Sequence, residues 1–96
     1  MHVILWRFRP RPDREAAFVA AYGDDGAWAQ FFRTGDGFLG SELMRGTDGV
    51  YLTVDRWVSE EAYRAFAGAK SSRYAELDAA CSALTLEETL LGEFVV

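Results

Sequence analysis

The chain has 96 residues, of which 50% are hydrophobic and 15% aromatic, so it can form a core and does not belong to the disordered classes. Its 15 acidic and 10 basic residues give a formal net charge of −5, which disfavours nucleic acid and anionic membranes as partners. No apolar run approaches a membrane span and the N-terminus lacks the pattern of a signal peptide, so we expect one cytoplasmic domain over residues 1–96.

A strand and a helix are expected at the start of the chain. Residues 2–9 alternate between two faces that are both apolar, which is typical of a strand covered on both sides. Prolines end this strand, and the spacing of apolar residues predicts a helix over residues 13–22. The faces of the strand carry Ile4, Trp6 and Phe8 on one side and Val3 and Leu5 on the other.

A glycine-rich break follows this helix. Gly23 and Gly26 interrupt the helical pattern, and a shorter apolar turn comes after them. It carries the large rings of Trp28, Phe31 and Phe32. The rings fit either the core, which is the favoured reading, or a lid over the mouth of a pocket.

Two strands joined by a tight turn are expected next. Residues 38–45 and 51–57 flank the turn Gly46-Thr-Asp-Gly49, which predicts a β-hairpin. The second of these strands has one apolar face that ends at Arg56. Its other face is either a half-exposed edge or the wall of a pocket, and carries Tyr51, Thr53, Asp55 and Trp57.

The remaining residues predict two helical segments and a last strand. Ser59 is a suitable N-cap for a helix that runs to residue 67, because two glutamates follow it in the first turn. Gly68 and the serines at 71 and 72 predict a bend, after which a helix resumes over residues 73–83. Residues 86–96 are expected to form the closing strand.

The resulting order βαββαβ predicts a ferredoxin-like α+β fold, with an antiparallel four-stranded sheet and helices on one face. Two helical segments can cover only one face of such a sheet. Since the first and last strands are apolar on both faces, we expect the second face to meet the sheet of another copy in a homodimer.

Three stretches of the chain resemble the antibiotic biosynthesis monooxygenase domains, a family within the dimeric α+β barrel group. They are GFLGSELMRGTDG at 37–49, VYLTVDRWVSEEAYRAF at 50–66 and the closing YAELDAACSALTLEETLLGEF. The shared pattern covers nearly the whole domain and is more specific for the fold than for one activity. The resemblance implies cofactor-free oxygenases of anthrones and quinols, haem-degrading proteins, and enzymes that degrade or isomerise signal molecules.

In the anthrone-oxidising members, a pocket is lined by an Asn and a Trp on the third strand and by a Tyr on the next helix. The Trp and the Tyr correspond to Trp57 and Tyr63, whereas the Asn position holds Thr53. A second-strand Tyr of those members falls at Leu43, and a late second-helix Arg falls near Asp78. These departures count against the anthrone mechanism of the family.

Haem-degrading members carry an Asn on the first strand and a Trp and a His on the second helix. The corresponding positions hold Trp6, Phe66 and approximately Glu76. Because that helix has no His to bind the iron, the resemblance does not extend to haem degradation, and no cofactor is expected.

Oxygenation without metal or flavin requires a substrate that gives an electron to dioxygen as a phenolate or enolate. The protein then supplies an apolar pocket, a base, and hydrogen-bond donors for the developing oxyanion. We predict as catalytic residues Trp57, which offers a stacking surface and an N–H, Tyr63, and Asp55 as a base of raised pKa. The predicted substrate-binding residues are Tyr51, Thr53, Phe66 and Trp6.

These residues also have purely structural interpretations. Trp57 fits a packing plug, Tyr63 fits a core position, and Asp55 fits a surface or interface charge. His2 lies next to Met1, where a frayed or edge-strand side chain is expected. Cys81 fits a small hydrophobic residue of the core and, as the single cysteine, forms no internal disulfide. No His or Cys grouping has ligand spacing, so no metal site is predicted.

Two functions follow from these observations. The first is a small monooxygenase or isomerase that acts on an aromatic, quinol-like or enolisable compound bound between helices and sheet. The second is a non-catalytic small-molecule-binding or assembly domain of the same fold.

Overall fold

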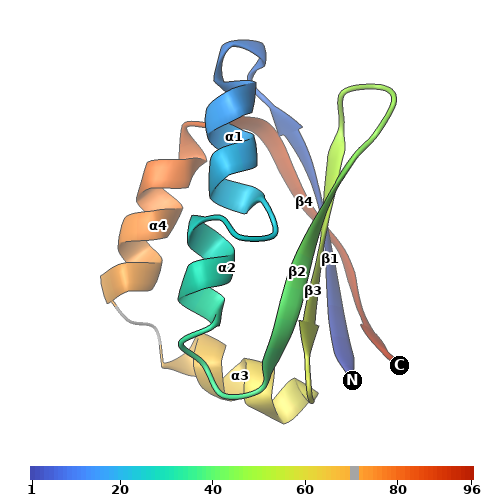
Figure 1. The fold of residues 1–96 in the computed structure, drawn as a ribbon, viewed down its shortest axis with the longest axis vertical. Helices are drawn as coiled ribbons and strands as arrows, with labels where there is room; N and C mark the ends of the chain where they lie inside the picture. The colour runs from blue at the N-terminus through green and yellow to red at the C-terminus, as the bar shows by residue number, and fades with distance from the viewer. Residues whose placement is uncertain (70–71) are drawn as a thin grey trace.

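The computed structural model describes residues 1–69 and 72–96, and its strands form a four-stranded sheet in the order β2-β3-β1-β4 (Figure 1). Each pair of neighbouring strands is antiparallel. The order along the chain and within the sheet confirms the predicted ferredoxin-like α+β fold. The strands are β1 (His2–Pro10), β2 (Phe38–Arg45), β3 (Tyr51–Trp57) and β4 (Thr85–Val95).

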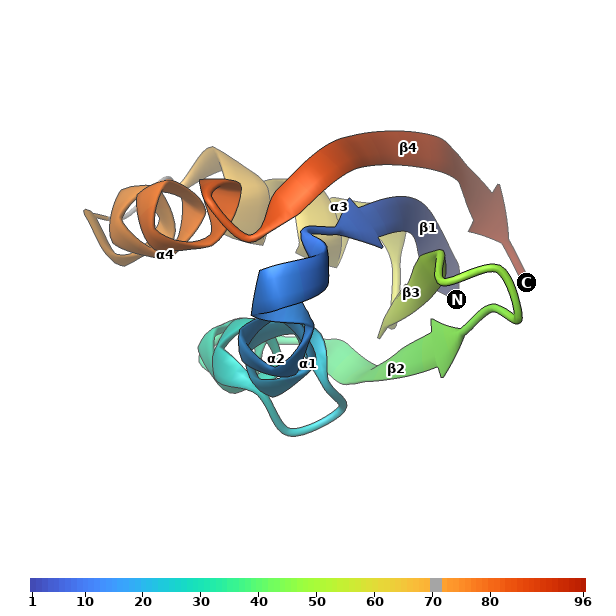
Figure 2. The same ribbon diagram turned by 90° about the horizontal axis from the view of Figure 1, so that it is seen from above.

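The helices lie on one side of this sheet (Figures 1 and 2). A short 3-10 turn, η1 (Pro12–Arg14), precedes the first of them. Helices α1 and α2 follow β1, while α3 and α4 follow β3, so each half of the chain contributes helices to the same layer. The helices are α1 (Glu15–Tyr22), α2 (Ala27–Phe32), α3 (Glu60–Gly68) and α4 (Ser72–Ser82).

Local signals in the sequence set most of the element boundaries. The Ser59 hydroxyl accepts a hydrogen bond of 3.1 Å from the backbone N–H of Ala62, so the predicted N-cap of α3 is confirmed. Strand β1 runs one residue beyond its predicted end, because Pro10 occupies the last paired position, where the ladder of hydrogen bonds ends. Of the bend predicted after Gly68, Ser71 lies outside the described residues.

The helices cover the face of β3 that carries Tyr51, Thr53, Asp55 and Trp57. Each of these side chains is at most 9% exposed, so this inner face is no half-exposed edge. The adjacent residues of β1 extend the same face. Their register places Ile4 opposite Asp55, Trp6 opposite Thr53 and Phe8 opposite Tyr51.

Beneath α1 the inner face is filled by a compact cluster of side chains. The ring of Phe18 is fully buried and lies 5.4 Å from that of Phe8 and 5.1 Å from that of Tyr51. Cys81 and Leu84 complete the cluster, which agrees with the predicted core role of Cys81. This part of the molecule is a conventional hydrophobic core.

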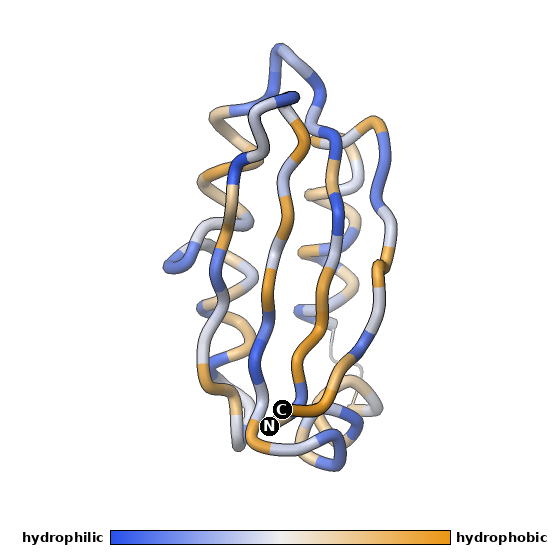
Figure 3. The backbone as a smooth tube through the Cα atoms, turned by 90° about the vertical axis from the view of Figure 1, so that its right-hand side faces the viewer, coloured by the Kyte–Doolittle hydropathy of each residue, from blue (hydrophilic) through white to orange (hydrophobic). Residues whose placement is uncertain are grey.

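The outer face of the sheet, which is turned toward the viewer in Figure 3, has no helix over it. Val3 is paired with Phe94 of β4, and Leu52 is paired with Met44 of β2. Phe94 remains 49% exposed and Met44 39% exposed. These exposed side chains are consistent with the predicted homodimer, which stays a prediction.

Candidate active site

A cavity of about 460 Å³ lies between the inner face of the sheet and the helices. Strands β1 and β3 form its floor, and α2 and α3 supply most of its aromatic walls. Exposed residues of α4 and β4 mark its mouth. A ligand in it would contact ring faces over most of its surface and polar groups at two places, the floor and the mouth.

The polar group of the floor is a pair formed by Asp55 and Ser41. The hydroxyl of Ser41 donates a 2.6 Å hydrogen bond to Oδ1 of Asp55, across the β2–β3 ladder. Thr53, two residues before Asp55 on the same face, also lines the cavity. The floor therefore holds a carboxylate that is oriented by a neighbouring hydroxyl.

Burial changes the acidity of this carboxyl. The side chain of Asp55 is only 9% exposed, and this burial raises its pKa from 3.8 to about 6, although the hydrogen bond from Ser41 opposes the shift. A carboxyl with such a pKa is ionised near neutral pH and is a stronger base than an exposed aspartate. It is suited to take a proton from a bound phenol or enol.

Trp57 stands where the floor meets the helices. Its side chain is fully buried, with ring contacts of 5.2 Å to both Phe38 and Phe66 and of 5.8 Å to Tyr63. It also lines the cavity. The same indole thus packs against several rings and also forms part of the cavity wall. The packing interpretation and the pocket interpretation of Trp57 are therefore compatible.

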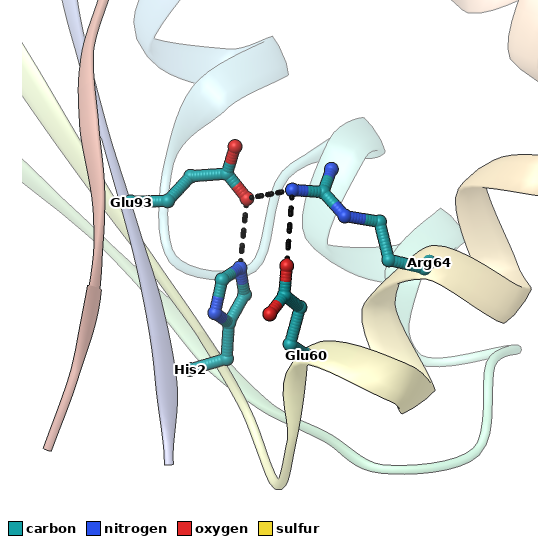
Figure 4. Close-up of polar contacts among 4 residues, drawn as sticks. All are labelled: His2, Glu60, Arg64 and Glu93. Carbon is teal, nitrogen blue, oxygen red and sulfur yellow. Dashed lines mark hydrogen bonds and ion pairs between the residues drawn. The ribbon is translucent and has the colours of Figure 1, made fainter.

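Tyr63 packs against His2, which belongs to a network of polar and charged side chains. Its ring lies 5.6 Å from the ring of His2, and His2 Nε2 lies 2.8 Å from Oε1 of Glu93. Arg64 donates a 2.8 Å hydrogen bond to the same oxygen and also contacts Glu60 (Figure 4). The network ties β1, β4 and α3 together behind the phenol.

This network corrects the expectation for His2. The side chain is 4% exposed rather than frayed, because β1 is a central strand and Glu93 of the adjacent β4 pairs with the imidazole. Its Nδ1 is buried without a hydrogen-bond partner within residues 1–69 and 72–96.

The mouth of the cavity combines aromatic rings with carboxylates. Tyr22, Trp28 and Tyr74 line this end together with the exposed side chains of Asp78 and Glu88. Although the Glu88 residue is exposed overall, partial burial of its carboxyl raises the pKa, and the nearby Asp78 raises it further. The mouth is therefore acidic and aromatic at once.

Trp28 belongs to the cavity wall, and Phe32 does too, so part of the aromatic turn contributes to the pocket. Trp28 Nε1 is buried and has no partner with hydrogen-bond geometry in the described part of the chain. It lies near enough to Cys81 to lower the pKa of that thiol, which burial otherwise raises. It also acts to lower the pKa of Tyr22, so this N–H faces polar groups of the protein itself.

The structure brings most of the predicted site residues to one cavity. Trp57, Tyr63 and Asp55 all line it, as do the predicted binding residues Thr53, Phe66 and Trp6. Tyr51 is the exception, since its ring packs against Phe18 in the cluster beneath α1. The roles of these side chains in binding or converting a substrate remain predictions.

The sequence analysis missed several lining residues. Ser41 faces Asp55 because β2 contains an irregularity between Phe38 and Gly40, which shifts the register of the strands. Gly40, at this irregularity, has a φ of +146°. A glycine within a strand often marks a bulge, so Gly40 was the signal in the sequence that could have predicted the shift in register. Glu88 and the aromatic part of the mouth come from separate elements, so no local spacing joined them.

Gly35 sets the position of one aromatic wall. A Cβ atom on this glycine would clash with the ring of Phe66, so only glycine allows the loop before β2 to approach the ring so closely. Phe66 is held by this loop on one side and borders the cavity on the other.

Residues 1–69 and 72–96 contain neither a metal-binding group nor a membrane-spanning helix. No group of three or more His, Cys, Asp and Glu side chains is placed to hold a metal ion. No helix of these residues is long and apolar enough to cross a membrane.

The sequence profile of the antibiotic biosynthesis monooxygenase family matches residues 1–75. The chain therefore belongs to this family, in agreement with the resemblance noted in its motifs. Comparison with curated protein sequences found no significant match.

Several solved structures are similar to this chain over nearly its whole length. A monooxygenase from the gene ActVA-Orf6 of Streptomyces coelicolor, in complex with Nanaomycin D, is 27% identical with a TM-score of 0.78, covering 99% of this chain and 86% of that one. Rv0793 from Mycobacterium tuberculosis is 26% identical with a TM-score of 0.71, covering 99% and 96%. A mutant of SnoaB, a cofactor-independent oxygenase from Streptomyces nogalater, is 23% identical with a TM-score of 0.80, covering 99% and 91%, and shows likeness of fold.

Proposed function

We propose that the protein is a cofactor-independent monooxygenase that acts on a small aromatic, quinol-like or enolisable substrate in the cavity. The observation that carries the proposal is the buried carboxyl of Asp55, with a pKa of about 6, on the floor of a cavity with aromatic walls. Membership of the family and the likeness to the ActVA-Orf6 monooxygenase support the class of reaction.

In the proposed reaction the Asp55 carboxylate takes a proton from the substrate, which becomes a phenolate or an enolate. This anion gives an electron to dioxygen, and the resulting substrate radical and superoxide combine to form a peroxide on carbon. The protonated carboxyl returns its proton to the peroxide. Loss of water then leaves a carbonyl group, so one oxygen atom enters the product, the other leaves as water, and the substrate supplies all the electrons.

The other predicted residues bind and orient the substrate. The faces of Trp57, Trp6 and Phe66 provide stacking surfaces for a flat ligand. Tyr63 presents a phenol whose pKa is raised by burial and further by Glu93, so it stays protonated and can donate a hydrogen bond to the developing oxyanion. Thr53 offers a hydroxyl beside Asp55.

A second candidate is a small-molecule-binding domain without catalysis. Positions that are polar in anthrone-oxidising relatives hold Thr53, Leu43 and Asp78, and Leu43 packs against the hydrophobic cluster. Leu43 does not line the cavity, and Thr53 and Asp78 stand there in place of the Asn and Arg, so the cavity can bind a ligand without the hydrogen bonds implied for anthrone-oxidising members.

We also propose that the outer face of the sheet packs against the same face of a second copy, in a symmetric homodimer in the cytoplasm. Phe94 and Met44 are large apolar side chains that such contact would bury. A native mass spectrum that shows a dimer would support the assembly, and a monomer at micromolar concentration would contradict it.

Oxygen uptake tests the proposed activity. Purified protein is mixed with an anthrone or a naphthohydroquinone under metal-free conditions, and oxygen consumption is followed with an electrode. We expect Asp55→Asn to lower the rate about 10²- to 10⁴-fold, the usual contribution of a general base. The control is Asp36→Asn, which changes an exposed carboxylate outside the cavity and should keep the rate.

Two results would contradict the proposal. Equal rates for the wild type and Asp55→Asn would remove the base from the mechanism. Tight binding of the same compounds with no protein-dependent oxygen uptake would favour the non-catalytic candidate.

A further inference from the structure

The mouth of the cavity has the composition of a site for organic cations. The ring of Trp28 lies 6.2 Å from that of Tyr22 and 5.6 Å from that of Tyr74, the latter at an interplanar angle of 73°. The rings thus face one end of the cavity from more than one direction. Cations are attracted to the faces of aromatic rings, and groups of such rings recognise ammonium ligands in proteins.

Two carboxylates stand beside these rings. Burial raises the pKa of Tyr74, and the charges of Asp78 and then Glu88 raise it further, so both carboxylates lie close to this phenol. Asp78 comes from α4 and Glu88 from β4, and both line the cavity. The negative charge is therefore brought together by the fold rather than by neighbouring positions in the sequence.

Within the residues that the structure describes, these carboxylates lack the counter-charges that Glu87 and Glu93 have. On β4, Glu87 lies 3.4 Å from the guanidinium of Arg7, and Glu93 lies 2.8 Å from that of Arg64. Within the described part of the chain, Glu88 and Asp78 form no ion pair. Among the described residues that line the cavity there is no Lys, Arg or His, whereas Asp55 adds a third acidic group on the floor.

We propose that the substrate carries a protonated amine next to its aromatic or enolisable part, and that the amine binds among Tyr22, Trp28 and Tyr74 with Asp78 and Glu88 as its counter-charges. This inference rests on the proposed function, because it identifies the ligand of the same cavity. The aromatic part lies over Trp57, and the ionisable carbon or oxygen faces Asp55. A substrate with a carboxylate would place like charges together at the mouth and is disfavoured.

Direct binding of matched probes tests the preference without requiring turnover. Calorimetric titration compares (aminomethyl)anthracene, (hydroxymethyl)anthracene and anthracene carboxylate, which share a ring system and differ in charge. We expect the ammonium probe to bind at least about tenfold more tightly than the carboxylate, and the ratio to fall as salt is added. Equal affinities, or tighter binding of the carboxylate, would overturn the proposal.

A double variant locates the preference. Asp78→Asn together with Glu88→Gln should reduce the ratio between ammonium and carboxylate probes to about unity, while the alcohol binds as before. The matched control is Glu76→Gln together with Glu87→Gln, which removes the same charge from the same two elements but outside the cavity. It should keep most of the ratio. A ratio that survives the first double variant would show that the preference arises elsewhere and would overturn the assignment.

The two proposals fail in different ways. Binding of the alcohol with no charge preference would leave the cavity and the oxygenase proposal intact but exclude the amine. A clear preference for the ammonium probe without oxygen uptake by any amine-bearing hydroquinone would keep the ligand class and exclude the oxygenase.

Discussion

The two halves of the inner sheet face are built from the same strands but filled differently. Beneath α1, the ring of Phe18 lies 5.1 Å from that of Tyr51, and the two rings belong to a closed core. Beneath α2 and α3, the same face borders the cavity of about 460 Å³, with Asp55 and Trp57 on its edge. A short stretch of β3 therefore passes from core to candidate site.

The comparison shows that the helices decide where the face is open. Helix α1 directs Phe18 straight onto the sheet, whereas Phe32 of α2 and Phe66 of α3 lie 5.9 Å apart and contact each other and Trp57 around the cavity. Alternation along a strand determines which side chains share a face. It does not determine which of them a helix will cover directly.

The largest effect is expected from truncating one buried ring in each half of the inner sheet face, which should separate the core role from the pocket role. Phe18→Ala and Trp57→Ala both remove fully buried rings, so each should lower the free energy of unfolding by about 3–5 kcal/mol. Only Trp57→Ala should also weaken binding of an aromatic probe in protein that is still folded. Denaturant unfolding and calorimetry measure the two effects, with the exposed neighbour Val19→Ala as control. Loss of probe binding in folded Phe18→Ala protein would show that the halves are not independent.

The pH dependence of stability should distinguish the buried Asp55 from exposed carboxylates. Its pKa rises from 3.8 in the unfolded chain to about 6 in the folded one, so the folded state binds the proton more tightly. The resulting stabilisation is present below pH 3.8 and is lost as pH rises through about 6, a change of about 3 kcal/mol.

This contribution is measured against a variant that cannot titrate. Asp55→Asn should gain stability relative to the wild type between pH 4 and pH 7, by about 3 kcal/mol if Asn keeps its contact with Ser41. Unfolding curves at several pH values give the difference. A difference that does not change with pH would mean that the carboxyl titrates normally.

The smallest expected effect concerns the hydroxyl that orients this carboxyl. Ser41→Ala removes the 2.6 Å hydrogen bond to Asp55 and should cost about 1 kcal/mol of stability. Because that bond lowers the pKa of Asp55, its loss should move the acidic limb of the oxygen-uptake profile to higher pH. Ser82→Ala, which removes an exposed hydroxyl bonded to the backbone of Ala79, is the control. An unchanged limb would exclude a positioning role for Ser41.

The fold could be predicted because its signals are local. The alternation in β1 and β3, the turn at residues 46–49 and the Ser59 cap each act over a few residues, and together they define the βαββαβ order. The family pattern uses the same signals. Around Pro10 and the following 3-10 turn, the observed elements differ from the predicted ones only in where the first strand ends and the first helix begins.

The site was predictable only where it lies along one strand. Thr53, Asp55 and Trp57 share a face by their spacing, so they could be grouped without a structure. His2 could not be interpreted in this way, because its partner Glu93 is 91 positions away. Ser41 depends on the irregularity in β2, and the acidic mouth depends on Asp78 of α4 and Glu88 of β4 lining the same cavity. Such contacts arise from tertiary structure alone.

The clash that any side chain at position 35 would make has a consequence for ligand size. Phe66 is the nearest group to that position, and its other side borders the cavity. A larger residue at 35 would push the ring inward, so the volume open to a substrate is controlled from a loop that the substrate never touches. We therefore expect substitution at position 35 to change the size of ligand that the cavity accepts, although this residue does not line it.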